Sequence, residues 1–279
     1  MLDLHRHTDA RAFLARAEPW LLTREIEHAG VLQSARQARA DDSRYERPIY
    51  WATLEDDGRL VGCAYRTPPF KVGVTALPDA AIAPLVADLA ATYPGNISGF
   101  SGPDPTVSIL ASAWVEQRGG SWSVNTRGRL MSFSGGAADD GATKKGVLRL
   151  ADANDTALAQ SWGAAASIDS GIAALDGNLC VQLIRAKLLY FFADDRARCM
   201  LGLLRETRES VAVGIVYTPA TFRGQGYATA ALRALDRLLE ERGVKNRYLW
   251  VDPRSDGAQA LAAKLGCRFV YDSIDIDCA

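Results

Sequence analysis

The sequence predicts an α/β protein built from two modules of similar plan, each with a mixed sheet. Three observations lead to this fold class. The chain has 279 residues, nearly twice the ~150 residues that one domain typically takes. Hydrophobic residues make up 48% of it and charged residues 23%, which supplies a core and excludes a disordered or collagen-like chain. Each half also follows the order hairpin, strand, helix, strand, helix, strand, which favours a duplication.

A stretch without hydrophobic periodicity divides the chain. It reads SFSGGAADDGATKKG over residues 132–146, where Gly, Ala, Asp and Lys dominate. Such a composition is typical of a linker or an exposed loop. We therefore expect a first domain over residues 1–133, a linker over 134–146 and a second domain over 147–279.

The first half opens with helical structure over residues 9–40, rich in Ala, Leu, Arg and Glu. The turn Glu55–Arg59 lies between two short apolar runs, which predicts a hairpin. A helix over 79–92 follows Pro78, with Asp79 as its expected N-cap. The other elements predicted here are the strands Tyr50–Leu54, Leu60–Arg66, Val72–Leu77, Asn96–Phe100 and Trp122–Phe133 and a helix over 105–118.

The second half repeats this order around a long amphipathic helix. Apolar residues at helical spacing predict that helix over 226–242, and Gly243 ends it. Helices across 154–187 and a hairpin turn at Asp194–Ala197 come before it in the chain. The other elements predicted here are the strands Val147–Leu150, Leu188–Ala193, Arg198–Leu204, Val211–Thr218, Tyr248–Val251 and Arg268–Ile276 and a helix over 256–265.

Composition disfavours several classes of function. The net charge of −1 gives the whole chain no bias toward polyanions, and no run approaches the roughly 18 apolar residues of a membrane helix. The N-terminus lacks the apolar stretch of a signal peptide. The 5 cysteines show no CxxC spacing, and an odd number without a secretion signal indicates reduced thiols in a cytoplasmic protein. We expect neither a nucleic-acid partner nor a membrane partner.

Histidines give no sign of a metal site or of a hydrolase. The 3 histidines are His5, His7 and His28. The HxH pair has no acidic or cysteine partner at metal-site spacing, so we expect no metal. A Ser-His-Asp hydrolase is hard to support when every histidine stands so early in the chain.

The most informative segment joins a strand to a helix over residues 211–243, VAVGIVYTPATFRGQGYATAALRALDRLLEERG. Gly224 and Gly226 lack side chains, so an anion can approach the backbone. The first N–H groups of the helix have no partners within it, and Arg223 adds a positive charge. The loop suits a diphosphate; the alternative is a turn that only packs a helix against a strand. Without GxGxxG or GK[ST], dinucleotide binding and nucleotide hydrolysis are disfavoured.

This loop resembles the acetyl-CoA signature of the GCN5-related N-acetyltransferases (GNAT), Q/R-x-x-G-x-G/A, at Arg223, Gly226 and Ala228. Downstream, YLWVDPRSDGAQALAAKLGCRFV resembles the family's second motif through Asp252 and the run Lys264-Leu265-Gly266. The VYTP lead-in and the GYA ending resemble a bacterial subgroup with two such domains in tandem. The resemblance is specific over 211–270 and faint over 1–133.

The resemblance implies two tandem GNAT-like domains, of which the C-terminal one uses acetyl-CoA as its co-substrate. The N-terminal domain would be degenerate, because its strand-to-helix segment VGVTALPDAAIAPL lacks the signature glycines. By the same resemblance, a backbone N–H of the strand before the loop stabilises the thioester oxygen, and this strand pairs with pantetheine. The cofactor-binding residues so implied are Val216, Tyr217, Thr218, Arg223, Gly224, Gln225, Gly226, Tyr227, Ala228, Thr229 and Ser255.

The sequence departs from the family's motifs at two positions of the expected site. Where family members often have a Tyr that protonates the departing thiolate, this chain has Ala262, and Ser255 replaces an Asn that contacts CoA. Tyr217 is the candidate general acid, with a half-buried core aromatic as the alternative. Asp252 is the candidate general base, with a helix-capping role as the alternative.

The sequence therefore supports an acetyl-CoA-dependent N-acetyltransferase, in which an amine attacks the thioester directly. The acceptor would be a small-molecule or peptide amine, and a homodimer is compatible with this assignment. The alternative is a non-catalytic module that binds acetyl-CoA or CoA for regulation, a reading that Ala262 favours.

Overall fold

The computed structural model describes residues 2–95, 97–133, 144–172, 175–206 and 209–279. They form two compact units, and the α/β class with mixed sheets is confirmed. Unit 1 comprises Met1–Leu130 and Val270–Ala279, and unit 2 comprises Met131–Phe269. The expected linker at 134–146 falls outside the described residues except for its last three.

Unit 1 has the strand order β1-β2-β3-β4-β5-β12-β6. The strand β1 was not predicted from the sequence; it pairs antiparallel with β2. The elements of this unit are β1 (Leu2–Arg6), α1 (Ala10–Leu22), α2 (Glu25–Ala40), β2 (Tyr50–Asp56), β3 (Arg59–Arg66), β4 (Val72–Val74), the 3₁₀ turn η1 (Asp79–Ala81), α3 (Ile82–Thr92), β5 (Gly99–Pro103), α4 (Thr106–Arg118), β6 (Trp122–Phe133) and β12 (Arg268–Cys278).

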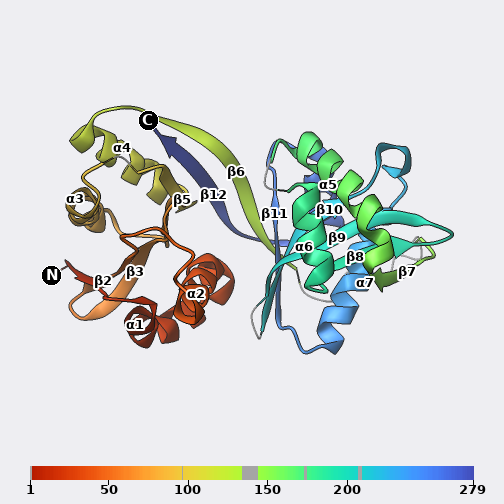
Figure 1. Cartoon of the computed structure of the whole chain (residues 1–279), viewed down its shortest axis with the longest axis horizontal. Coiled ribbons are helices and arrows are strands. Elements are labelled where there is room, and N and C mark those ends of the chain that lie inside the picture. Colours follow the sequence, from red (N-terminus) through yellow and green to blue (C-terminus); the bar gives the residue numbers. More distant parts are fainter. Residues whose placement is uncertain (1, 96, 134–143, 173–174, 207–208) are drawn as a thin grey trace. The chain divides into compact units, whose positions relative to one another are not determined.

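Helices cover both faces of the sheet in unit 1 (Figure 1). Alternate residues of β2 point to opposite faces. Tyr50 and Leu54 are buried with α3 and α4, whereas Trp51 is buried with α1 and α2. Because residues of the predicted hairpin alternate between the two faces of the sheet, they contribute to two separate cores.

The C-terminal strand β12 completes the sheet of unit 1, although the sequence suggested that residues 147–279 form one domain. It pairs antiparallel with β5. Ile274 and Ile276 are buried with α3 and α4, and Lys71 forms ion pairs with Asp275 and Asp277. Apolar burial and charge pairing together hold residues 270–279 in unit 1.

Unit 2 has the strand order β6-β11-β10-β9-β8-β7, in which β6 contributes residues 131–133. Its further elements are β7 (Val147–Leu150), the 3₁₀ turn η2 (Ala153–Asp155), α5 (Thr156–Ser170), α6 (Gly177–Arg185), β8 (Leu189–Ala193), β9 (Ala197–Glu206), β10 (Ser210–Tyr217), the 3₁₀ turn η3 (Ala220–Phe222), α7 (Tyr227–Glu241), β11 (Asn246–Val251) and α8 (Asp256–Lys264).

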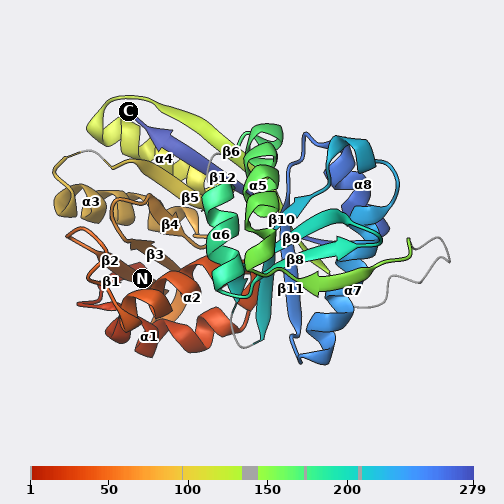
Figure 2. The same cartoon turned by 45° about the vertical axis from the view of Figure 1, so that its right-hand side comes forward.

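The layers of unit 2 follow the plan of unit 1. The helices α7 and α8 cover one face of its sheet, and α5 and α6 cover the other (Figure 2). Leu232, Leu235 and Leu239 of α7 are fully buried, as the helical spacing predicted. Phe191 and Ile215 point to the opposite face, among residues of α5 and α6.

Across the part of the chain that the structure describes, no helix has both the length and the hydropathy that a membrane span requires. Within the same residues, no three His, Cys, Asp or Glu side chains gather where they could hold a metal ion. All 5 cysteines have free thiols.

Candidate functional site

The strand β10 separates from β11 before it ends. The two strands pair in parallel from Ser210 to Val213, opposite residues 246–249. On its other side, β10 stays paired with β9 as far as Tyr217, which lies opposite Met200. Among the described strands, residues 214–217 therefore have no partner on the β11 side. Their backbone donors and acceptors can pair with an extended ligand, as in strand addition.

A bulge at Gly214 accompanies this separation. Val213 lies opposite Leu203 and Ile215 opposite Gly202, which leaves Gly214 as an extra residue in β10. A Cβ atom at Gly214 would overlap the side chain of Leu204, which would have to move to admit any other residue. A bulge bends its strand and increases the twist, and this bend accounts for the divergence from β11.

The loop after η3 leaves its backbone open. Gly224 has φ +73° and Gly226 has φ +86°, in the left-handed region that favours glycine. A Cβ at Gly224 would meet nothing within 4 Å, and one at Gly226 would meet Lys144 at 3.9 Å. Gln225 donates its side-chain amide to the carbonyl of Thr221 at 2.9 Å. The loop therefore has room for an anion against its backbone.

Helix α7 begins directly after this loop, with Gly226 as its N-cap. No side chain caps the helix, and its first turn contains no acidic residue. The N–H groups of Tyr227, Ala228 and Thr229 have no acceptors within the helix. The partial positive charge of the helix start and these N–H groups favour an anion at this point.

Arg223 is turned toward the protein. Its Nε donates to the carbonyl of Thr218 at 2.9 Å, and its guanidinium pairs with Asp169 of α5. It also lies over the ring of Tyr217, 5.8 Å from the centroid. Arg223 therefore fixes the loop to β10 and α5, and Asp169 offsets much of its charge. No local pattern could reveal Asp169, which lies 54 residues earlier.

Lys144 supplies a second cation at the start of α7. Its Nζ lies 5.4 Å from the ring centroid of Tyr227. The ring of Tyr227 is buried, and its hydroxyl bonds to Asp194 at 3.2 Å. Lys144 is not among the residues predicted for the site, because it belongs to the segment interpreted as a linker.

Val216 and Tyr217 are the last two residues of β10, and Thr218 follows directly. Val216 packs on the α7 face, and Tyr217 packs on the α5–α6 face. Tyr217 is 9% exposed, and the centroid of its ring lies 5.8 Å from that of Trp162. Tyr217 thus has the environment of a core aromatic at the edge of the diverging strand.

Asp252 and Ser255 organise the turn between β11 and α8. The Asp252 carboxylate accepts the backbone N–H of Arg254 at 2.8 Å and pairs with its guanidinium at 3.0 Å. This pairing lowers the pKa of Asp252, which weakens it as a base. Ser255 is the N-cap of α8 and accepts from Ala258. Ala262 is buried in the core that α7 and α8 share.

Residues 182–267 match the model of the family described as "Acetyltransferase (GNAT) family". No curated protein matches the sequence.

Solved structures resemble the chain over its whole length. An acetyltransferase of the GNAT family from Colwellia psychrerythraea is 12% identical with a TM-score of 0.56, over 99% of this chain and 100% of that one. A tandem GNAT protein of the clavulanic acid biosynthesis pathway, solved without AcCoA, is 11% identical with a TM-score of 0.56, over 100% and 98%. A Drosophila protein is 14% identical with a TM-score of 0.65, over 99% and 98%. At such identities the likeness shows the fold alone.

Proposed function

We propose that the chain transfers the acetyl group of acetyl-CoA to an amine and that unit 2, in which residues 182–267 match the model of the GNAT acetyltransferase family, performs the reaction. One observation carries this proposal. The strand β10 loses its partner strand just before it enters a glycine loop and an uncapped helix start. An extended chain that ends in a diphosphate fits this succession of backbone groups.

The residues present fit acetyl-CoA in type and in order. The backbone of Val216–Thr218 would pair with the amides of pantetheine, and that of Gly224–Thr229 would hold the diphosphate. Lys144 would add a positive charge beside the helix start, since Arg223 is already paired with Asp169. When bound, acetyl-CoA supplies an acetyl group activated as a thioester.

The chain's own groups would assist the transfer in two ways. A backbone N–H at the unpaired end of β10 can stabilise negative charge on a carbonyl oxygen, because its position is fixed in advance. Tyr217, at the end of the same strand, is the candidate proton donor from its hydroxyl. The amine must lose a proton; the ion pair of Asp252 with Arg254 disfavours that carboxylate as the base.

Release of the CoA thiol from acetyl-CoA tests this function. The panel comprises small primary amines, an aminoglycoside, peptides with free N-termini and a lysine peptide. We expect at least one amine to raise thiol release well above the rate of hydrolysis. Tight acetyl-CoA binding without release on any of these amines would instead support the non-catalytic regulatory module.

Replacement of Tyr217 by Phe tests the proton donor. We expect kcat to fall by about a hundredfold, since positioned acids and bases contribute on that order, while acetyl-CoA affinity stays unchanged. Tyr190→Phe is the matched control, because Tyr190 is a buried tyrosine of unit 2 whose hydroxyl contacts Arg242. Turnover of Tyr217→Phe within twofold of the wild type would eliminate Tyr217 from the chemistry.

A further inference from the structure

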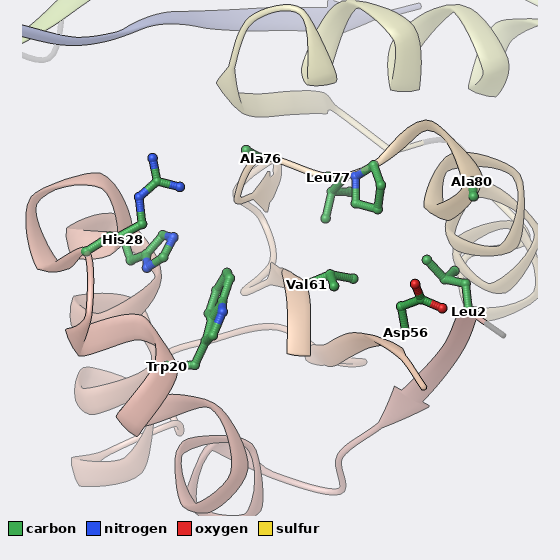
Figure 3. A pocket seen from close by; sticks show the side chains of 10 residues that line it. Leu2, Trp20, His28, Asp56, Val61, Ala76, Leu77 and Ala80 are labelled. Atoms are coloured by element: carbon green, nitrogen blue, oxygen red, sulfur yellow. The ribbon is translucent and has the colours of Figure 1, made fainter. Parts of the chain in front are cut away.

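Unit 1 contains a cavity of about 540 Å³ at the end of its sheet where β2 finishes and β3 begins (Figure 3). The corner between α1 and α2 forms one wall, and the ends of β1 and β2 with the segment 76–80 form the other. The volume is in the range of small-molecule sites. Nothing in the proposed chemistry of unit 2 uses it.

A flat aromatic surface borders this cavity. The rings of Trp20 and His28 stack at 4.4 Å with an interplanar angle of 19°. His28 is 4% exposed, and its Nδ1 donates to the carbonyl of Leu21 at 3.0 Å, which fixes the imidazole. Trp20 stands between His28 and Val61 (Figure 3), so its second face borders the hollow. A ring stacked there would add to a stack that the fold already holds in place.

The surface that faces Trp20 is apolar and incompletely covered. Val61 and Leu77 are half-buried and line the cavity. Leu77 lies over Gly62, where a Cβ atom would overlap its side chain. Half-buried aliphatic groups around a hollow leave apolar area in contact with water, and a ring that covered them would remove that area from solvent.

Opposite charges stand on the two walls. Arg24 lies at the N-cap position of α2, on the same wall as Trp20 and His28. Its Nε and one terminal nitrogen bind Glu27 at 2.9 and 2.7 Å, and a guanidinium has five N–H donors, so others can reach a second anion. Asp56 lies at the end of β2 beside Leu2, across the cavity from Trp20 (Figure 3).

The walls do not suit a CoA diphosphate. Pro78 has no N–H, and Asp79 places a carboxylate in the first turn of η1, where an anion would be repelled. The N–H of Leu77 is already bound to the hydroxyl of Thr106 at 3.3 Å. The ligand of this cavity therefore differs from that of unit 2.

We propose that this cavity binds a small molecule in which a flat ring separates an anionic group from a cationic group. The ring lies between Trp20 and the Val61–Leu77 wall, the anion faces Arg24, and the cation faces Asp56. The site belongs to unit 1 alone, and its occupancy is measured without any assay of acetyl transfer.

Calorimetric titration of the full chain with four probes tests the proposal. 4-(Aminomethyl)benzoate carries both charges and the ring; 4-methylbenzoate lacks the cation, benzylamine lacks the anion, and 6-aminohexanoate lacks the ring. We expect the first to bind at least about threefold more tightly than each of the others, because an ion pair with an exposed side chain and an aromatic contact each contribute on this order.

Substitutions in the cavity lining test whether the probe binds at this site. Arg24→Gln and Asp56→Asn should each weaken 4-(aminomethyl)benzoate roughly threefold, as expected for ion pairs at exposed positions, whereas Arg11→Gln and Asp57→Asn, outside the cavity lining, should leave its affinity unchanged. These charge changes are at exposed positions, so circular dichroism should show an unaltered fold. Absence of binding by all four probes would overturn the proposal. So would equal affinity for 6-aminohexanoate, or binding that neither Arg24→Gln nor Asp56→Asn weakens.

Discussion

The two units share one plan, but they treat the strand-to-helix connection differently. In unit 1, η1 continues directly into α3 through Ala81, whose backbone is helical. In unit 2, the segment Arg223–Gly226 separates η3 from α7, and Gly226 takes a left-handed conformation. Only the second arrangement leaves glycine backbone next to an uncapped helix start, which is what a diphosphate needs.

The strand before this connection also differs between the units, because only in unit 2 does it separate from the neighbouring parallel strand. In unit 1, a Cβ at Gly102 of β5 would lie 2.5 Å from the carbonyl oxygen of Val74, the last residue of β4. The strands β4 and β5 therefore remain close to each other as far as the end of β4. In unit 2, β10 runs on to Tyr217 after its pairing with β11 stops at Val213. A bulge and a short glycine insertion thus distinguish two otherwise similar modules, and we propose on this basis that unit 1 is degenerate for acetyl-CoA.

The largest expected effect is a loss of stability in unit 1 that leaves unit 2 intact. Ile276→Ala should destabilise unit 1 by about 2–5 kcal/mol, since it creates a cavity in a packed core, and Ile276 is 0% exposed among α3 and α4. Peptide-resolved hydrogen exchange should then show lost protection in α3 and α4. Acetyl-CoA binding should persist.

Leu239→Ala is the mirror control, because Leu239 is fully buried in the core of unit 2. It should lower protection in α7 and α8 and leave α3 protected. If Ile276→Ala reduced protection mainly in α7 and α8, the assignment of β12 to unit 1 would be wrong.

A smaller effect comes from the start of α5. The Asp155 carboxylate accepts from the Arg149 guanidinium at 2.6 Å and from the Asp152 N–H at 2.9 Å, and Arg149 lowers the pKa of Asp155. A lowered carboxyl pKa stabilises the fold above its unfolded value of about 3.9 and ceases to do so as pH falls through the folded value. Asp155→Asn should therefore destabilise unit 2 by about 1–2 kcal/mol at neutral pH.

Thermal unfolding followed from neutral pH down to about pH 3 checks this sign. The difference between wild type and Asp155→Asn should be constant above pH ~5 and shrink as the wild-type carboxyl becomes protonated. A difference that grew at acid pH would contradict the role assigned to Asp155.

The smallest effect concerns the cation at the loop. Lys144→Gln should weaken acetyl-CoA roughly threefold at low salt, because one exposed charge near a helix start contributes little. The deficit should disappear near 0.5 M salt, where screening is strong. Lys145→Gln is the neighbouring control, and an equal loss in both variants would show a general charge effect instead of a contact by Lys144.

Local patterns predicted much of unit 2. The helical spacing of Leu232, Leu235 and Leu239 placed the core face of α7, because amphipathic periodicity is a property of the segment alone. The glycines at 224 and 226 predicted an open backbone for the same reason, and both have positive φ in the structure. Helix and turn signals act over a few residues, so the sequence displays them directly.

Long-range relations were not predictable in this way. The pairing of β12 with β5 joins Ile276 to Phe100, and no local signal selects a partner strand at such a distance. The short strand β1 reads LDLHR, too polar to be recognised without its partner β2. The ion pair of Arg223 with Asp169 likewise depends on tertiary packing.

Titration calorimetry with acetyl-CoA tests most directly the claim that unit 2 alone holds this molecule. We expect one molecule bound per chain in the wild type. Gly226→Glu should show no measurable binding, since it places a strained backbone and a negative charge at the helix start. Two molecules per chain, no binding by the wild type, or wild-type affinity in Gly226→Glu would contradict the account.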